Sequence, residues 1–122
     1  MMDILTLCNL IGDITKTKIY PIEFPDIEEQ TLSKLELTTA MLEEGGLFDF
    51  TMEIGTKASN PKDAERLSID IINKLHRKTD IEYEGYQIVL ITADRPYPEH
   101  KEILEDGKHF YTCKFRTLAC IM

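Results

Sequence analysis

The side chains best suited to chemistry gather near the C-terminal end of the chain. Two histidines and three of the four acids of residues 99–109 form this group: Glu99, His100, Glu102, Asp106 and His109. Imidazole and carboxylate groups are ligands for transition metals. The spacing H-x-x-x-H on a regular element, which would aim two imidazoles at one ion, does not occur in this sequence. We therefore expect a solvated, charged loop and no metal site.

Two pairs of acids are candidates for general acid and base catalysis. Glu28 and Glu29 are adjacent, as are Glu43 and Glu44, and each pair lies in or beside an expected turn. The carboxylates of glycosidases flank a cleft from separate elements of the fold. Adjacent acids in turns are instead typical of a solvated surface.

Other catalytic residue types lack the partners that they need. Ser59 and Ser68 have no base nearby, and His76 falls at the expected end of a helix, where a cation interacts with the helix dipole. No GxSxG, P-loop or dinucleotide-binding fingerprint occurs. The sequence therefore predicts no enzyme and no cofactor. One alternative of that class stays open, a small cytosolic α+β enzyme or regulatory protein with its site at residues 94–109.

The cysteines and the N-terminus both favour a protein of the cytoplasm. Cys8, Cys113 and Cys120 are odd in number and show no CxxC spacing, so we expect small hydrophobic core residues. The first residues lack a basic region and a cleavage site for secretion. No apolar run approaches the roughly 20 residues that span a bilayer, so no membrane partner is expected.

Length and charge limit the remaining possibilities. A chain of 122 residues with 43% hydrophobic content predicts one domain over residues 1–122. The net charge is −8, from 22 acids and 14 bases, and the longest basic cluster, at residues 74–78, falls at a helix end. Specific binding of nucleic acid is therefore not expected. A basic protein partner, or a role of the charge in solubility, is compatible with this balance.

The segment from Leu47 to Arg77 organises the expected fold. Apolar and polar residues alternate over residues 47–54, which predicts a half-buried strand that Gly55 ends. Asn60 and Pro61 then open a helix to about Arg77, with the Asn60 side chain accepting the amide of Asp63. The helix carries one apolar stripe: Ala64, Leu67, Ser68, Ile71 and Leu75.

The other elements follow from periodicity and turn residues. We expect a helix at 3–16, an edge segment at 18–25 that contains Pro21, and strands at 34–41, 83–93 and 109–121. Leu35, Leu37, Thr39 and Met41 should share one face, and Gly45-Gly46 should form a hairpin turn. A bend near Gly85 and a two-sided central strand at 88–91 are also expected. The fold class is α+β, a mainly antiparallel sheet with two helices packed on one face.

Four residues are candidates for an interface with another subunit or partner. Ile69 and Ile72 lie off the apolar stripe of the 61–77 helix, so they face either a wide core or a neighbouring subunit. Arg95 and Tyr97 lie in a loop stiffened by two prolines at 94–98 and are residue types that anchor interfaces. The alternative for that loop is a rigid connector with Tyr97 packed on its own domain.

The order of these elements resembles a known family. The segment "FTMEIGTKASNPKDAERLSIDIINKL", followed by "DRPYPEHKEILEDGKHF" and a final strand with aromatic residues, resembles the small tail-terminator and minor capsid (head–tail joining) proteins of long-tailed bacteriophages. The matching packing positions are Asn60, Pro61, Ala64, Ile71 and Leu75. The resemblance covers nearly the whole chain through the order and length of its elements.

The resemblance implies an interaction function without turnover. It implies a ring, commonly a hexamer, that caps the tail tube at its head-proximal end and contacts the tail tube protein and a head-completion protein. The protein would then be found in the virion, after assembly from the host cytoplasm. Another head–tail connector or head-completion adaptor is the alternative. Acids in loops could line the channel and repel DNA: Asp26, Glu28, Glu29, Glu43 and Glu44.

Overall fold

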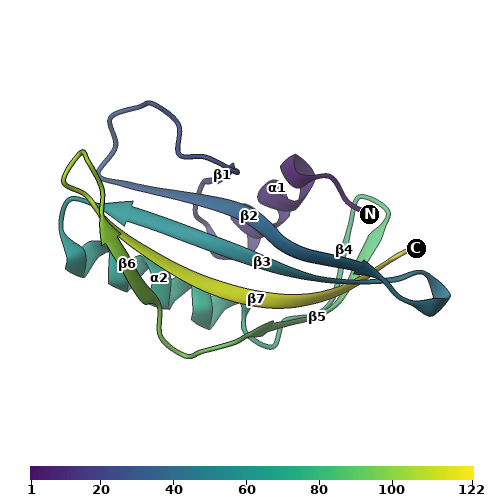
Figure 1. The fold of residues 1–122 in the computed structure, drawn as a ribbon. Helices are drawn as coiled ribbons and strands as arrows, with labels where there is room; N and C mark the ends of the chain where they lie inside the picture. The colour runs from purple at the N-terminus through teal and green to yellow at the C-terminus, as the bar shows by residue number, and fades with distance from the viewer.

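The computed structural model describes the backbone of residues 1–122 and all side chains except that of Glu44. Figure 1 shows a long, curved sheet accompanied by two helices. The elements in chain order are α1 (Ile4–Thr15), β1 (Ile19–Pro21), β2 (Thr31–Leu42), the short 3-10 turn η1 (Glu44–Gly46), β3 (Leu47–Ala58), α2 (Pro61–Leu75), β4 (Thr79–Tyr83), β5 (Tyr86–Ala93), β6 (Glu99–Ile103) and β7 (His109–Ile121).

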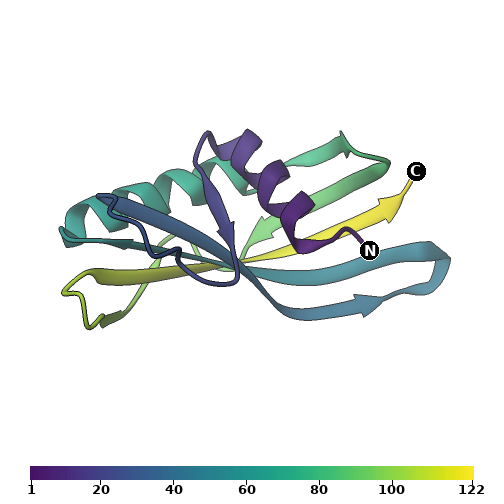
Figure 2. The ribbon, with the colours of Figure 1, turned by 90° about the horizontal axis from the view of Figure 1, so that it is seen from above.

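The sheet confirms the expected α+β class. Its strand order is β1-β2-β3-β7-β5-β4. β5 pairs with residues 115–121 of β7, and β6 pairs with residues 109–112 on the same edge. Every described pair is antiparallel except β1 with β2. Figure 2 shows both helices on the same face of this sheet. The segment with Pro21 is an edge strand as expected, since only β2 pairs with it.

The core lies between this face and the helices. Alternate residues of β3 and β7 point into it, so Phe50, Met52, Ile54 and Phe115 are at most 1% exposed. The helices cover them with their apolar faces, to which these residues belong: Leu7, Ile11, Ile71, Ile72 and Leu75. The alternation expected in residues 47–54 and 109–121 is therefore confirmed.

The start of α2 differs from the expectation in one hydrogen bond. The Asn60 side chain accepts the amide of Lys62 at 2.9 Å, not that of Asp63. The Asp63 amide is already bonded to the Asn60 carbonyl oxygen at 3.1 Å. The side chain therefore satisfies the neighbouring free amide, which is an equivalent N-terminal cap.

Gly55 does not end its strand, because β3 continues to Ala58. A Cβ atom at residue 55 would lie 2.6 Å from Cε1 of Phe110, whose ring crosses the backbone there. Phe24 contacts the same ring edge to face, with 5.6 Å between ring centroids. The glycine thus permits a close approach of an aromatic ring on the face of the sheet away from the helices.

β2 also departs from simple alternation. The register of β2 against β3 shifts between Leu37 and Thr39, which marks a bulge. Leu35 and Leu37 lie opposite Ile54 and Met52 on the core face, but Thr39 and Met41 lie opposite Thr51 and Asp49 on the other face. The prediction of one shared face for all four β2 residues is therefore wrong beyond the bulge.

Two expected segments contain strands that the sequence did not reveal. Residues 83–93 were expected as one bent strand, but Glu84 and Gly85 form a turn with positive φ angles of 48° and 82° between β4 and β5. β5 is covered on one face only, and a register shift beside Val89 brings Ile88 and Ile91 both into the core. The expected charged loop at 99–108 contains β6, which pairs with β7.

The hairpin turn at Gly45 and Gly46 is confirmed, with φ angles of 79° and 78°. Replacing both glycines by valine forces a β-branched residue into the left-handed region at a cost of about 1–2 kcal/mol per position. We expect a melting temperature several degrees below that of the parent. The matched control is Glu43→Val at the same turn, where the backbone is extended. Equal melting temperatures for the two variants would contradict this account of the turn.

Candidate assembly surfaces

Exposed apolar side chains concentrate at one end of the molecule. Figures 1 and 2 show the β2–β3 hairpin tip and both chain termini at this end. We call its exposed apolar residues the end patch: Met1, Met41, Leu42, Ile121 and Met122. Their exposed fractions run from 40% for Met1 to 73% for Leu42. An exposed apolar concentration of this kind is typical of a surface that another molecule covers.

The edge of β2 near this patch is also open. β1 pairs only with Ser33, Lys34 and Leu35, so no described strand lies beside the outer edge of β2 from residue 37 to residue 42. That segment contains no charged residue and no proline. Natural edge strands commonly carry such residues as protection against pairing. The segment therefore has the chemistry of a contact surface.

The four expected interface residues divide between core and surface. Ile72 is only 3% exposed and belongs to the core of its own subunit, so its side chain is not offered to a neighbour. Ile69 is half-buried and remains a candidate. Arg95 is exposed and remains a candidate as well.

Tyr97 combines both alternatives foreseen for its loop. It is 48% exposed. A hydrogen bond to Glu65 of α2, together with partial burial, raises the pKa of Tyr97 above its ordinary value. Tyr97 thus lies close to its own helix while about half of its surface is accessible.

A small groove lies between the C-terminal part of α2 and the connector after β5. Its volume is about 190 Å³, and it is lined by Ile72, Asn73, His76, Ala93, Asp94, Arg95 and Pro96. Nδ1 of His76 accepts a hydrogen bond from the Ala93 amide at 3.0 Å, which fixes the connector to the helix end. The His76 ring therefore serves as a hydrogen-bond acceptor with a structural role.

The expected channel-lining acids form no single surface. Asp26, Glu28 and Glu29 are exposed in the loop between β1 and β2. Glu43 is exposed at the hairpin tip, at the opposite end of the sheet (Figure 1). The side chain of Glu44 lies outside the described residues.

The acids and histidines of residues 99–109 do not converge on one point. His100 and His109 are hydrogen bonded through their rings at 3.2 Å, whereas Asp106 pairs with Lys57 at 3.0 Å. Within the described residues, no group of three or more His, Cys, Asp or Glu side chains could hold a metal ion. Nor is any described helix long and apolar enough to cross a membrane.

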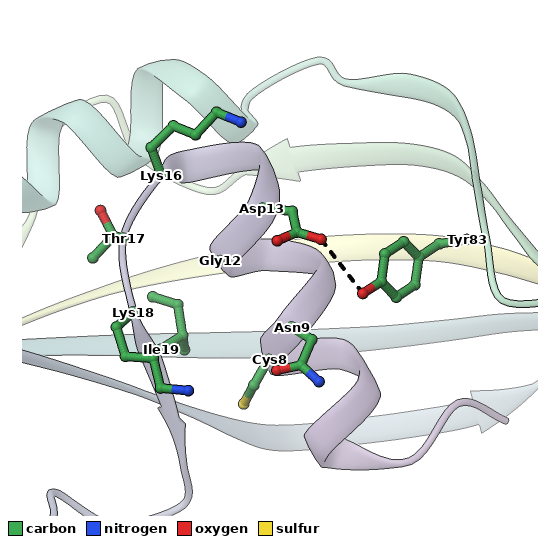
Figure 3. A pocket seen from close by; sticks show the side chains of 9 residues that line it. All are labelled: Cys8, Asn9, Gly12, Asp13, Lys16, Thr17, Lys18, Ile19 and Tyr83. Carbon is green, nitrogen blue, oxygen red and sulfur yellow. Dashed lines mark hydrogen bonds between the residues drawn. The ribbon is translucent and has the colours of Figure 1, made fainter.

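A larger cavity of about 430 Å³ lies beside α1 (Figure 3). Asp13 and Tyr83 point toward each other across it, and the Tyr83 hydroxyl donates to Asp13 at 3.4 Å. Cys8 also lines the cavity, but burial raises the pKa of its thiol to about 11. Burial raises the pKa of Cys113 to about 12. Both thiols are protonated at neutral pH, as expected for core cysteines.

Comparison with known proteins finds a similar fold among solved structures. No protein-family model matches this sequence, and no curated protein matches it. Among solved structures, a chain in the "Virion of native gene transfer agent (GTA) particle" has a similar fold, with a TM-score of 0.58 and 14% sequence identity. The similarity covers 91% of this chain and 84% of that chain. At this identity the comparison concerns the fold.

Sequence reasoning missed the end patch as a site. The available signal was the apolar pair Met41-Leu42 just before the turn and the pair Ile121-Met122 at the other end of the chain. Turns are ordinarily flanked by small and polar residues. Only the pairing of β3 with β7 brings the two pairs to the same end.

The burial of the two isoleucines makes a direct test. Ile72→Glu places an unpaired charge in the core and should cost roughly 3–5 kcal/mol, a large part of ordinary domain stability. Ile69→Glu is the matched control, because the same charge at a half-buried position can reach water. Circular dichroism melts should show an unfolded or strongly destabilised Ile72 variant and a folded Ile69 variant. A fully stable Ile72→Glu protein would contradict the assignment of Ile72 to the core.

Proposed function

We propose that this chain is a structural subunit of a phage-like virion, and more specifically a tail-terminator-like subunit that forms a ring at the head-proximal end of the tail. The observation that carries the proposal is the similarity in fold to a chain of a gene transfer agent virion over 91% of this chain. The order of elements resembles the tail-terminator family, which supports the more specific assignment.

The surfaces of the chain suit a protein that works by contact. An end patch with an open strand edge lies at one end of the sheet, and a groove beside Arg95 lies elsewhere on the subunit. Two different surfaces per copy allow head-to-tail contacts, which generate rings when the rotation between copies closes. The ring would be a hexamer by family resemblance, and its faces would contact the tail tube protein and a head-completion protein.

Two other functions remain for comparison. A different head–tail connector or head-completion adaptor would share the contact surfaces described above. An enzyme with its site at residues 94–109 has less support, because the acids and histidines there are engaged in separate pairs. Turnover, a cofactor, specific nucleic-acid binding and a membrane partner are therefore not part of the proposal.

The state of assembly tests the proposal. Purified protein, alone and mixed with tail tubes formed from the tube protein of the same genome, would be studied by light scattering and negative-stain electron microscopy. We expect a ring whose mass is a multiple of the 14.1 kDa subunit, either in solution or at tube ends. A protein that stays monomeric over the whole concentration range and does not bind tube ends would overturn the proposal. Oligomers that form in solution but do not bind tube ends would favour the adaptor.

We further propose that the acids of the β1–β2 loop line the channel of the ring. Asp26, Glu28 and Glu29 are exposed, and their carboxylates take part in none of the described ion pairs. A negative channel wall would repel the phosphate backbone and let DNA pass without being held. Glu43 and Glu44 lie at the other end of the sheet, so the proposal is limited to the loop acids.

Charge reversal in this loop should change the behaviour of the ring toward DNA. The assembled Glu28→Lys, Glu29→Lys variant should retain DNA at low salt and release it as salt rises, because lysines neutralise phosphates. The matched control reverses Glu82 and Glu84 on the β4–β5 hairpin, which are equally exposed. Filter binding of both rings at several salt concentrations measures the difference. DNA retention that is equal in the two variants would count against a channel position for the loop.

A further inference from the structure

We propose that the β2–β3 hairpin tip of one subunit docks into the groove between α2 and the connector at 93–96 of a second copy. In this contact Leu42 covers the apolar part of the groove and Glu43 lies beside Arg95. The inference rests on the proposed ring and names the contact that would hold its neighbours together.

The hairpin tip has the form and chemistry of an inserting arm. β2 and β3 are each 12 residues long and remain paired up to Leu42 and Phe48. The Glu43 amide bonds to the Leu47 carbonyl oxygen at 2.7 Å, which closes the turn. Leu42 is 73% exposed, although it lies opposite Phe48 on the face of the sheet that the helices cover elsewhere. A preformed arm loses little conformational entropy when it binds.

The tip is acidic as well as apolar. The sequence after Leu42 reads Glu43-Glu44-Gly45-Gly46. Glu43 is exposed and makes none of the ion pairs among the described side chains. Its charge is thus available to a partner.

The groove offers the complementary properties. Ala93 and Pro96 supply apolar surface, and the exposed Arg95 makes none of the described ion pairs. Asp94 also lines the groove, and its backbone amide donates a hydrogen bond to the Lys114 carbonyl oxygen at 3.1 Å. The prolines and the bond from Ala93 to His76 keep the connector in place.

The charge distribution of the whole chain favours a second copy as the occupant. The net charge is −8, so most surfaces of two copies repel each other. The longest basic cluster of the chain, at residues 74–78, begins in the last turn of α2 and continues beyond it, and its His76 lines the groove. An acidic tip and a groove beside the basic cluster are therefore the complementary pair that one chain carries. Because tip and groove are different surfaces, the contact is head to tail and can close into a ring.

Half-buried Ile69 fits the same contact. It precedes Asn73, which lines the groove, by one helical turn, so the two side chains lie on one face of α2. Ile69 would form the rim of the groove, where the side chain of Met41 or Leu42 could rest on it.

A charge exchange tests the pairing. Glu43→Arg and Arg95→Glu should each weaken self-association, by about tenfold in the midpoint concentration, because each brings like charges together. The chain with both substitutions should recover most of that loss, since every interface then contains the reversed pair. Sedimentation or light scattering over a concentration series gives the three midpoints. Wild-type association in both single variants, or no recovery in the combined variant, would overturn the docking proposal.

Cross-linking provides a second readout, because a disulfide traps the contact even where the contact forms only transiently. In a Cys120→Ser background, Leu42→Cys with Pro96→Cys should form disulfide-linked oligomers on mild oxidation, because both positions are exposed. The control pair, Leu42→Cys with Glu102→Cys, should give far less product. Rings without cross-links would overturn the docking alone and leave the proposed function standing. A wild-type chain that forms no oligomer, alone or on tail tubes, would overturn both.

Discussion

The pairing of β3 with β7 is the interaction on which the rest of the structure depends. It runs without a register shift from Leu47 opposite Cys120 to Ala58 opposite His109. The other long ladders, β2 with β3 and β5 with β7, each contain a shift. A slip of one residue in the central pair would turn the core residues of one of its strands, such as Phe50 of β3 or Phe115 of β7, away from the helices and disrupt the core. The bulges in the flanking ladders leave this central register intact.

The length of the same pair explains why one end of the sheet stays uncovered. Strands of 12 and 13 residues extend roughly 40 Å at about 3.3 Å per residue. The 15 residues of α2 extend only about 22 Å at ~1.5 Å per residue. α2 alone therefore cannot cover the whole apolar face, and α1 on the same face (Figure 2) leaves Leu42 and Ile121 exposed. Leu42 and Ile121 occupy core-facing positions at an end where the chain provides no cover, which is why this end has the chemistry of an interface.

Sequence periodicity predicted the elements that form the core and failed where a local irregularity interrupts the period. The helices, the Gly45-Gly46 hairpin and the last strand follow from repeating patterns. The bulge beside Thr38 was not visible, because Leu35, Leu37, Thr39 and Met41 alternate in sequence whether or not a residue is inserted into the ladder. The interface residues were harder to predict from the sequence than the secondary structure. Ile69 and Ile72 are equally apolar, and only the placement of α2 on β7 decides which one is buried.

Charge and apolar surface have different parts in an assembly of this chain. Each copy carries −8, but salt at physiological strength screens charges separated by more than about 8 Å. General repulsion therefore acts over short distances only, where it opposes contacts that bring two acidic surfaces together. Burial of side chains such as Leu42 supplies free energy without regard to orientation. A single pair of opposite charges at the tip and the groove adds modest affinity. It also penalises wrong registers, because the acids outnumber the bases by 22 to 14 and a displaced Glu43 more often meets another acid. In such a contact the burial of apolar side chains determines whether two copies associate, and the charge pair determines the position at which they dock.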